Sequence, residues 1–257
     1  MTLRELFVRE IKISKKIPRE SYFAALPAVR HLESNGLVFT RPVSFLVGEN
    51  GAGKSTIIEA LAVAMGFNPE GGTVNFHFST ADSHSDLYRY LTVVKGPLRR
   101  RDGFFLRAES FYNLASDIDR MDQGPSFGSR LADSYGGVSL HRRSHGESFL
   151  SVIENRFGGG GLYILDEPES ALSPMGLMSL ICQIKRLADT DSQLIIATHS
   201  PILMTFPGAE IFQLSDAGIQ SVPYRQTEHF RITRQFLNDP EKMLRFLLEE
   251  ESRPSSY

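Results

Sequence analysis

The sequence has little cysteine, no long apolar run and no excess of either charge, and each absence excludes a class of protein. Cys182 is the only cysteine among 257 residues, so the chain cannot form an internal disulfide. No stretch approaches the roughly 20 apolar residues of a membrane-spanning helix, and charged residues interrupt the N-terminus where a signal peptide needs an apolar core. We therefore expect a cytoplasmic protein with no transmembrane segment of its own.

The balance of charge also says little about ligands. A formal net charge of −2 gives no overall attraction to nucleic acid, so any contact with DNA must come from a local patch. The arginine run at residues 99–101 is one candidate, although short charge runs are usually solvated loops. Cys182 lies in an apolar, helix-like run and is expected to be a small buried side chain.

Short apolar runs alternate with helical patterns along the chain. Residues 43–47, 162–165 and 194–197 are nearly continuous apolar runs, as in strands that are buried on both faces of a sheet. Apolar residues at helical spacing follow the first run and occur again at about 174–187. The alternation predicts an α/β fold with a mostly parallel sheet covered by helices on both faces.

We interpret residues 1–257 as one domain of this kind. It begins with a strand within residues 3–13 and has an irregular insertion at about 68–103, with a single helix near 85–90. A loop-and-helix region follows at about 131–157, and a C-terminal helical tail at about 227–250. The apolar residues of the tail are expected to pack on the core of the chain itself.

Residues 48–55 form a phosphate-binding loop. Their sequence, GENGAGKS, matches G-x-x-x-x-G-K-[ST] and lies between an apolar strand and a helix, as the motif requires. Glycines let backbone N–H groups surround phosphates, and the helix presents its positive end to the same anion. Lys54 should reach the β- and γ-phosphates and Ser55 should bind magnesium. The predicted ATP-binding residues are Gly48, Glu49, Asn50, Gly51, Ala52, Gly53, Lys54, Ser55 and Thr56.

Two adjacent carboxylates follow the apolar run at 162–165. In open α/β sheets, ligands bind at the carboxyl ends of strands, where Asp166 and Glu167 are expected. Asp166 is predicted to hold magnesium through its water shell, and Glu167 to act as the base toward the attacking water. Alone, this pattern is equally typical of a strand that runs into a polar loop. Together with the phosphate loop it favours a catalytic site.

Residues 166–173, DEPESALS, resemble the second carboxylate motif and D-loop of ABC-type ATPases. Residues 198–201, THSP, are similar to the switch-histidine motif of that family, and the resemblance implies that His199 senses the γ-phosphate. Glu109 stands where the family has its glutamine loop, so it is a candidate magnesium contact. A plain loop carboxylate explains Glu109 equally well.

Residues 143–148, RSHGES, resemble in part the signature L-S-G-G-Q of the same family. Ser144, Gly146 and Glu147 agree with its kernel, while Arg143 and His145 depart from it. Ser144 can cap the following helix, which directs a hydroxyl and a positive helix end toward an anion. The resemblance implies that this anion is the γ-phosphate of ATP bound to a partner subunit.

The motifs are most similar to the non-transporter branch of the family, which includes chromosome-structure, recombination and phage-defence ATPases. More narrowly, the layout, including the tail from Thr227-Glu228-His229 to Asn238-Asp239-Pro240-Glu241, resembles small predicted bacterial ATPases without coiled-coil arms. The resemblance implies magnesium-dependent ATP hydrolysis in a head-to-tail homodimer, with Lys54, Glu167 and His199 as catalytic residues and with DNA or an effector protein as partner. The alternatives are a nucleotide-binding subunit of a membrane transporter and a scaffold that binds ATP without turnover. The intact motif residues argue against the scaffold.

Overall fold

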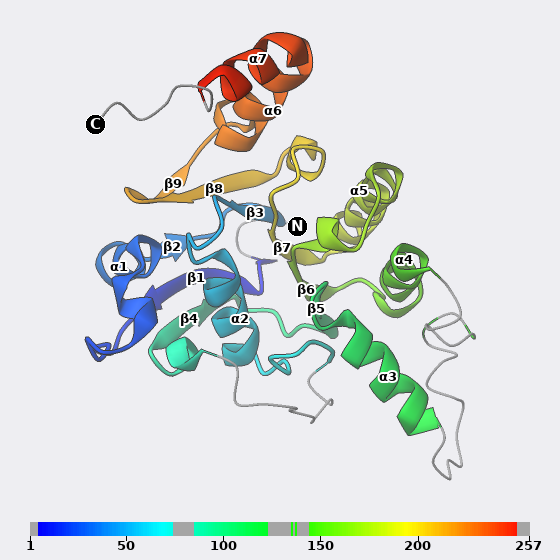
Figure 1. The fold of residues 1–257 in the computed structure, drawn as a ribbon. Helices are drawn as coiled ribbons and strands as arrows, with labels where there is room; N and C mark the ends of the chain where they lie inside the picture. The colour runs from blue at the N-terminus through cyan, green and yellow to red at the C-terminus, as the bar shows by residue number, and fades with distance from the viewer. Residues whose placement is uncertain (1–4, 74–84, 123–134, 136, 138–143, 251–257) are drawn as a thin grey trace.

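The computed structural model describes residues 5–73, 85–122, 135, 137 and 144–250 (Figure 1). Its strands are β1 (Val8–Ile13), β2 (Leu37–Val38), β3 (Val43–Val47), β4 (Leu91–Lys95), β5 (Asp102–Arg107), β6 (Gly161–Asp166), β7 (Gln193–Ala197), β8 (Glu210–Ser215) and β9 (Gly218–Ser221). Its α-helices are α1 (Pro27–Ser34), α2 (Lys54–Ala64), α3 (Phe111–Asp122), α4 (His145–Arg156), α5 (Pro174–Asp189), α6 (Glu228–Asn238) and α7 (Pro240–Glu250). Short 3-10 turns are η2 (Tyr22–Ala25), η3 (Asp86–Arg89), η6 (Pro168–Ser170), η7 (Leu203–Thr205) and η8 (Tyr224–Gln226).

The strands form two sheets. The larger has the order β5-β6-β7-β3-β8-β9, with parallel pairing from β5 through β8 and an antiparallel β9 at the edge. The smaller is antiparallel, with the order β2-β1-β4. Helices α3 and α4 lie between β5 and β6 in the chain, and α5 lies between β6 and β7, as is usual for crossovers between parallel strands. The predicted α/β fold with a mostly parallel sheet is confirmed.

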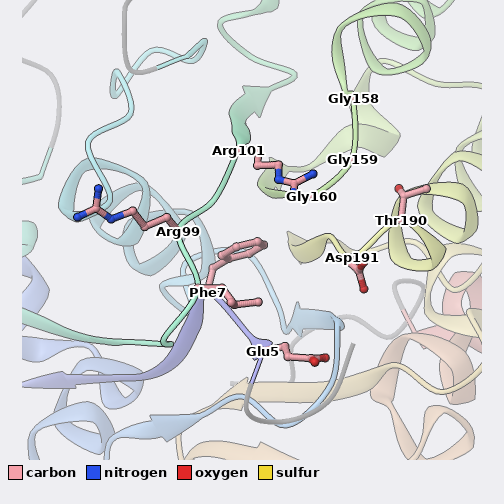
Figure 2. A pocket seen from close by; sticks show the side chains of 10 residues that line it. Glu5, Phe7, Arg99, Arg101, Gly158, Gly159, Gly160, Thr190 and Asp191 are labelled. Carbon is pink, nitrogen blue, oxygen red and sulfur yellow. The ribbon is translucent and has the colours of Figure 1, made fainter.

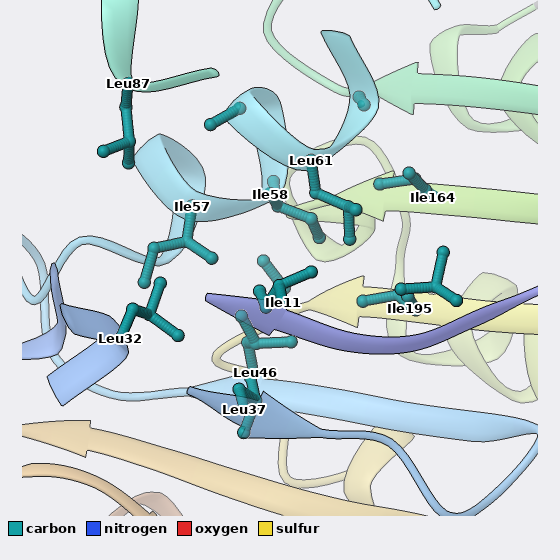
Figure 3. Packing of buried hydrophobic residues seen from close by; sticks show 14 of the residues in the cluster. Ile11, Leu32, Leu37, Leu46, Ile57, Ile58, Leu61, Leu87, Ile164 and Ile195 are labelled. Carbon is teal, nitrogen blue, oxygen red and sulfur yellow. The ribbon is translucent and has the colours of Figure 1, made fainter. Parts of the chain in front are cut away.

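Both faces of the large sheet are buried, and each has its own apolar core. On one face, α2 and the small sheet pack on side chains such as Leu46, Ile164 and Ile195 (Figure 3). On the other, α3, α4 and α5 pack on side chains such as Phe45 and Leu165. Neighbouring residues of one strand point to opposite faces. A strand buried on both faces is therefore apolar throughout, which explains the uninterrupted apolar run that ends in Leu165.

The turn from β3 into α2 requires glycine at two points. Gly48 has a φ of +151°, and a Cβ there would overlap the backbone carbonyl oxygen of Leu214. Gly53 precedes the first residue of α2 with a φ of +95°, in the left-handed region that glycine adopts most readily. These conformations hold the phosphate loop close to β8 and direct the start of α2 toward the carboxyl edge of the sheet.

The structure corrects the prediction of an irregular insertion at about 68–103. The expected helix near 85–90 is the short turn η3, but the next segment is the strand β4, which pairs antiparallel with β1 through Ile11 and Val93. Side chains of β4 are only partly buried, so its apolar pattern is weak in the sequence. Pairing with β1, some 80 residues earlier in the chain, stabilises β4, and the same pairing places β1 in the smaller sheet. The hairpin of β8 and β9 and the helices α1 and α3 were not predicted either.

The tail and Cys182 also differ from expectation. The tail contains two helices, α6 and α7, beside β8 and β9 (Figure 1), and no side chain of α6 is buried. Phe246 and Leu248 are 60% and 61% exposed, so the expected packing of the tail on the core is wrong. Cys182 is exposed because it lies on the outer side of α5, away from the buried Leu180 and Ile184. Within the described residues, every helix is too short or too polar to cross a membrane.

Asp102, the first residue of β5, joins three segments at the amino edge of the large sheet. Its carboxylate accepts hydrogen bonds from the Arg156 guanidinium at 2.9 Å, the Tyr163 hydroxyl at 2.8 Å and the Gly158 N–H at 3.2 Å. Burial by itself would raise the pKa of Asp102, but the hydrogen bonds and the ion pair outweigh it and lower that pKa below its usual value. The ionised carboxylate therefore stabilises the folded state.

We predict that Asp102→Asn lowers the free energy of unfolding at pH 7 by about 1–3 kcal/mol, because charged hydrogen-bond partners lose their acceptor. A carboxyl group whose pKa is lower in the folded than in the unfolded protein stabilises the fold at pH values above its unfolded-state pKa. This stabilisation is lost as the pH falls through the folded-state pKa. The difference from wild type should therefore shrink below about pH 4. Urea unfolding across this pH range measures it, with the exposed Asp216→Asn as control. A difference that stays constant with pH would contradict the assignment.

Candidate functional site

Lys54 lies inside the phosphate loop. Its side chain is almost fully buried, at 3% exposure, and Nζ donates hydrogen bonds to the carbonyl oxygens of Gly48 at 2.9 Å and Glu49 at 3.0 Å. Burial lowers the pKa of Lys54, while the negative charges of Glu167 and Asp166 oppose that shift. The ammonium is thus held where backbone N–H groups of the loop and the start of α2 also favour an anion.

The predicted carboxylates lie beside the start of α2. Asp166 is the last residue of β6, is 5% exposed and accepts a hydrogen bond of 3.1 Å from the hydroxyl of Ser55. Burial raises the pKa of Asp166 to about 6, although Arg107 and Ser55 act to lower it. Glu167 follows in a left-handed conformation, with φ 49° and ψ 53°, which is strained for a residue other than glycine. The Glu167 side chain is 36% exposed, unlike that of Asp166, and both carboxylates line one cavity of about 510 Å³.

The donor set of Ser55 and Asp166 fits magnesium. Magnesium prefers hard oxygen donors and is commonly bound by one or two carboxylates together with substrate phosphates. Among the described residues, no group of three or more His, Cys, Asp or Glu side chains could hold a metal ion by itself. Glu109 lines the same cavity of about 510 Å³ but is 86% exposed and paired with Arg107, so its contact with magnesium stays a prediction.

Arg107, the last residue of β5, was not predicted from the sequence. Its guanidinium lies 2.9 Å from Glu59 of α2, 3.2 Å from Glu109 and 3.4 Å from Asp166. Parallel pairing places Arg107 opposite Asp166 in the register of β5 and β6. Predicting it required knowing that these two strands are neighbours. Arg107 supplies the positive charge that an almost fully buried carboxylate needs.

The loop after β7 brings His199 to the carboxylates. Nε2 of His199 lies 3.4 Å from Oε1 of Glu167. Glu169, which is half-buried in η6, accepts hydrogen bonds from the Thr198 hydroxyl at 2.8 Å and from the backbone N–H of His199. Burial raises the pKa of Glu169, and these two hydrogen bonds act against the shift. Glu169 therefore ties the loop that carries His199 to the segment that carries Glu167.

The signature-like segment forms the start of α4. Ser144 caps this helix in a capping box, in which its hydroxyl accepts from the Glu147 N–H and the Glu147 carboxylate accepts from the Ser144 N–H. A Cβ on Gly146 would lie 3.1 Å from the carbonyl oxygen of Ala171, so α4 packs closely on the segment after Glu167. Ser144 and Glu147 are exposed, and neither lines the cavities next to the phosphate loop or the carboxylates. Arg143 lies outside the described residues.

A separate cavity of about 670 Å³ lies at the opposite edge of the large sheet, before the strands β5, β6 and β7 begin (Figure 2). It contains none of the predicted ATP-site residues; its lining includes Phe7, Arg99, Arg101, Gly159 and Asp191. The middle arginine of the run, Arg100, is packed on the ring of Phe67 and donates to the carbonyl of Met65 at 2.6 Å. The run is therefore not a purely solvated loop.

Two family models match segments of the chain that contain these motifs. One, described as "AAA domain", matches residues 28–103, including the phosphate loop. The other, described as "AAA domain, putative AbiEii toxin, Type IV TA system", matches residues 138–205, including Ser144, the two carboxylates and His199. None of the curated proteins compared with the chain matches its sequence.

One solved structure shares the fold at low sequence identity. The structure of cbiO1 from Clostridium perfringens, part of the ABC transporter complex cbiONQ, is 16% identical, with a TM-score of 0.53 over 95% of this chain and 99% of that chain. The SMC head domain from Thermotoga maritima is also 16% identical, with a TM-score of 0.43 over 85% of this chain and 99% of that one.

The fold and the phosphate loop define a P-loop nucleotide-binding domain. The family matches on both motif-bearing segments specify its class further. Over residues 28–103 and 138–205, its sequence is similar to AAA domains.

We predict that Glu169→Ala destabilises the fold by about 1–3 kcal/mol, because the half-buried N–H of His199 and the hydroxyl of Thr198 lose a charged acceptor. Urea unfolding measures the loss, and Glu33→Ala on the exposed surface of α1 serves as control. If Glu169→Ala were as stable as wild type, the hydrogen bonds of Glu169 would not be what holds the loop of His199 to the segment of Glu167.

Proposed function

We propose that this domain binds ATP with magnesium and hydrolyses it to ADP and phosphate. The observation that carries the proposal is the meeting of Lys54, Ser55, Asp166, Glu167 and His199, from three separate segments, at one edge of the sheet. These groups combine an anion-binding loop, oxygen donors for a hard cation and a carboxylate near a histidine. Each is a recurring part of sites that transfer a phosphoryl group to water.

The residues divide the work by their positions. Lys54 and the backbone of the phosphate loop neutralise charge on the transferred phosphoryl group. Ser55 and Asp166 would hold magnesium, which neutralises phosphate charge when it is bound. Glu167, whose backbone is in the strained left-handed conformation, orients the attacking water and accepts its proton. His199, next to Glu167, donates a hydrogen bond to the γ-phosphate.

Glu167→Gln should retain ATP binding and lower the turnover rate by about 10²–10⁴-fold, because the amide keeps the shape of the carboxylate but cannot take a proton. Steady-state phosphate release and ATP binding by calorimetry measure the two effects, with the exposed Glu20→Gln as control. Turnover by Glu167→Gln at the wild-type rate would refute the assignment of the base.

We further propose that the site is completed by a second copy of the chain in a head-to-tail dimer. Ser144 and the start of α4 are exposed and lie outside the cavities beside the phosphate loop. A capped helix start of this kind favours an anion, and the ATP of a second copy fits this chemistry. In such a dimer each ATP lies between the phosphate loop of one subunit and Ser144, Gly146 and Glu147 of the other.

Mixing two inactive variants tests this arrangement. Lys54→Ala disables the phosphate loop, and Ser144→Arg blocks the signature-like segment at the cost of a helix cap. We expect each variant alone to be inactive and an equal mixture to recover about a quarter of the wild-type rate, because half the dimers are mixed and each holds one intact site. Folding of each variant is checked by circular dichroism. No recovery on mixing would show that the signature-like segment does not act in trans.

For the biological role, we propose a switch whose ATP-closed dimer is read by DNA or by an effector protein in a DNA-linked or defence process. The second matched family is described as a toxin–antitoxin protein, which supports a role in defence. The alternative, a nucleotide-binding subunit of a transporter, is the role named for the cbiO1 neighbour. Double-stranded DNA added to the turnover assay tests the DNA-linked form, because only that form predicts stimulation. A rate that DNA does not change would point to a protein partner instead.

A further inference from the structure

His199 has a second partner, which lies in the C-terminal tail and outside the four ATP-site motifs. Nδ1 of His199 lies 2.9 Å from Nε2 of His229, and the two rings meet edge to face with centroids 5.1 Å apart. His229 is the second residue of α6, the first helix of the tail. The contact therefore joins the loop after β7 directly to the C-terminal helices.

The outer nitrogens of the pair indicate where the protons lie. Within the described part of the chain, Nε2 of His199 and Nδ1 of His229 are buried and complete no hydrogen bond. Nε2 of His199 nevertheless faces the Glu167 carboxylate at 3.4 Å, and an ionised carboxylate only accepts. This favours a proton on Nε2 of His199. Nδ1 of His199 is then an acceptor, and Nε2 of His229 must donate to it.

Both imidazoles are neutral in this arrangement. Burial, and after it the positive charge of Lys54, lowers the pKa of both His199 and His229 below the usual value. Nearby carboxylates oppose these shifts without reversing them: Glu167 at His199, and Glu228 and Glu49 at His229. A neutral pair shares one proton between the facing nitrogens, so the tautomer of each ring fixes that of the other. The Glu167 carboxylate selects the pair that has a proton on Nε2 of His199.

We propose that His229 is a positioning residue, which fixes His199 in the tautomer that carries its proton on Nε2 and so couples the tail to the nucleotide site. The proposal rests on the proposed function, in which His199 contacts the γ-phosphate. Phosphate oxygens accept hydrogen bonds, so only the Nε2–H form of a neutral His199 can bind one through this atom. His229 keeps that form populated before ATP arrives.

The start of α6 is well placed to transmit a movement. Thr227 caps the helix and is fully buried, and the N–H of Glu228 donates to the Gln213 side chain of β8 at 3.3 Å. The rest of α6 has no buried side chain. The tail is thus held mainly at the first turn of α6, which contains His229. A displacement of His199 at hydrolysis would therefore shift this turn through His229.

The test compares two substitutions of His229. His229→Phe keeps a ring of similar volume but removes the donor, whereas the side-chain amide of His229→Gln places an N–H near the position of Nε2. We expect His229→Phe to lower kcat by about tenfold with little change in the dissociation constant of ATP, and His229→Gln to recover most of the loss. His31→Phe on α1 is the control. Adding either substitution to His199→Ala should cost nothing further, because His229 acts through His199.

Nitrogen-15 NMR of the imidazoles in nucleotide-free protein gives a readout that does not depend on hydrolysis. We expect His199 to be protonated on Nε2 in wild type and to populate both tautomers in His229→Phe. An unchanged tautomer in His229→Phe, or equal losses of kcat in the Phe and Gln variants, would overturn the proposal. If wild type failed to hydrolyse ATP, the proposed function would fall, while the NMR result would still decide the role of His229.

Discussion

The parallel pairing of β5, β6, β7 and β3 is the constraint on which the site depends. Its register places Arg107 opposite Asp166, and Asp166 opposite Ala197, at matching ends of adjacent strands. Because parallel strands all end at one edge, the segments that follow them must leave the sheet together. The phosphate loop, the carboxylate turn and the histidine loop therefore meet, although more than 140 residues of chain separate the first from the last.

The same edge concentrates buried charge, which the structure balances locally. Asp166 is almost fully buried, and Arg107 compensates the cost of its ionised form while also contacting Glu59 of α2. Lys54 is held by backbone carbonyls of its own loop. The charges are thus fixed in place by strands and helices before any ligand binds, which is the preorganisation that electrostatic stabilisation of a phosphoryl-transfer reaction requires.

Two contacts tie the histidine loop to the rest of the site. Glu169 holds the backbone of His199 from the side of the carboxylate turn, and His229 meets its ring from the side of the tail. His199 consequently lies between the segment that carries Glu167 and the C-terminal helix α6. A movement of His199 would therefore change its contacts with both segments. The tail has exposed apolar side chains, and no side chain of α6 is buried in the core.

The sequence by itself determined the local chemistry and the class of fold. The phosphate loop, Asp166 and Glu167, the Ser144 cap and the buried strands 162–165 and 194–197 all depend on residues that lie close together in the chain, where spacing and apolar pattern are direct signals. Only the tertiary structure decided the partners of these residues. Arg107, the β1–β4 pairing, the exposure of the tail and the contact of His199 with His229 each join distant segments, and strand order and helix packing, which no local pattern encodes, bring those segments together.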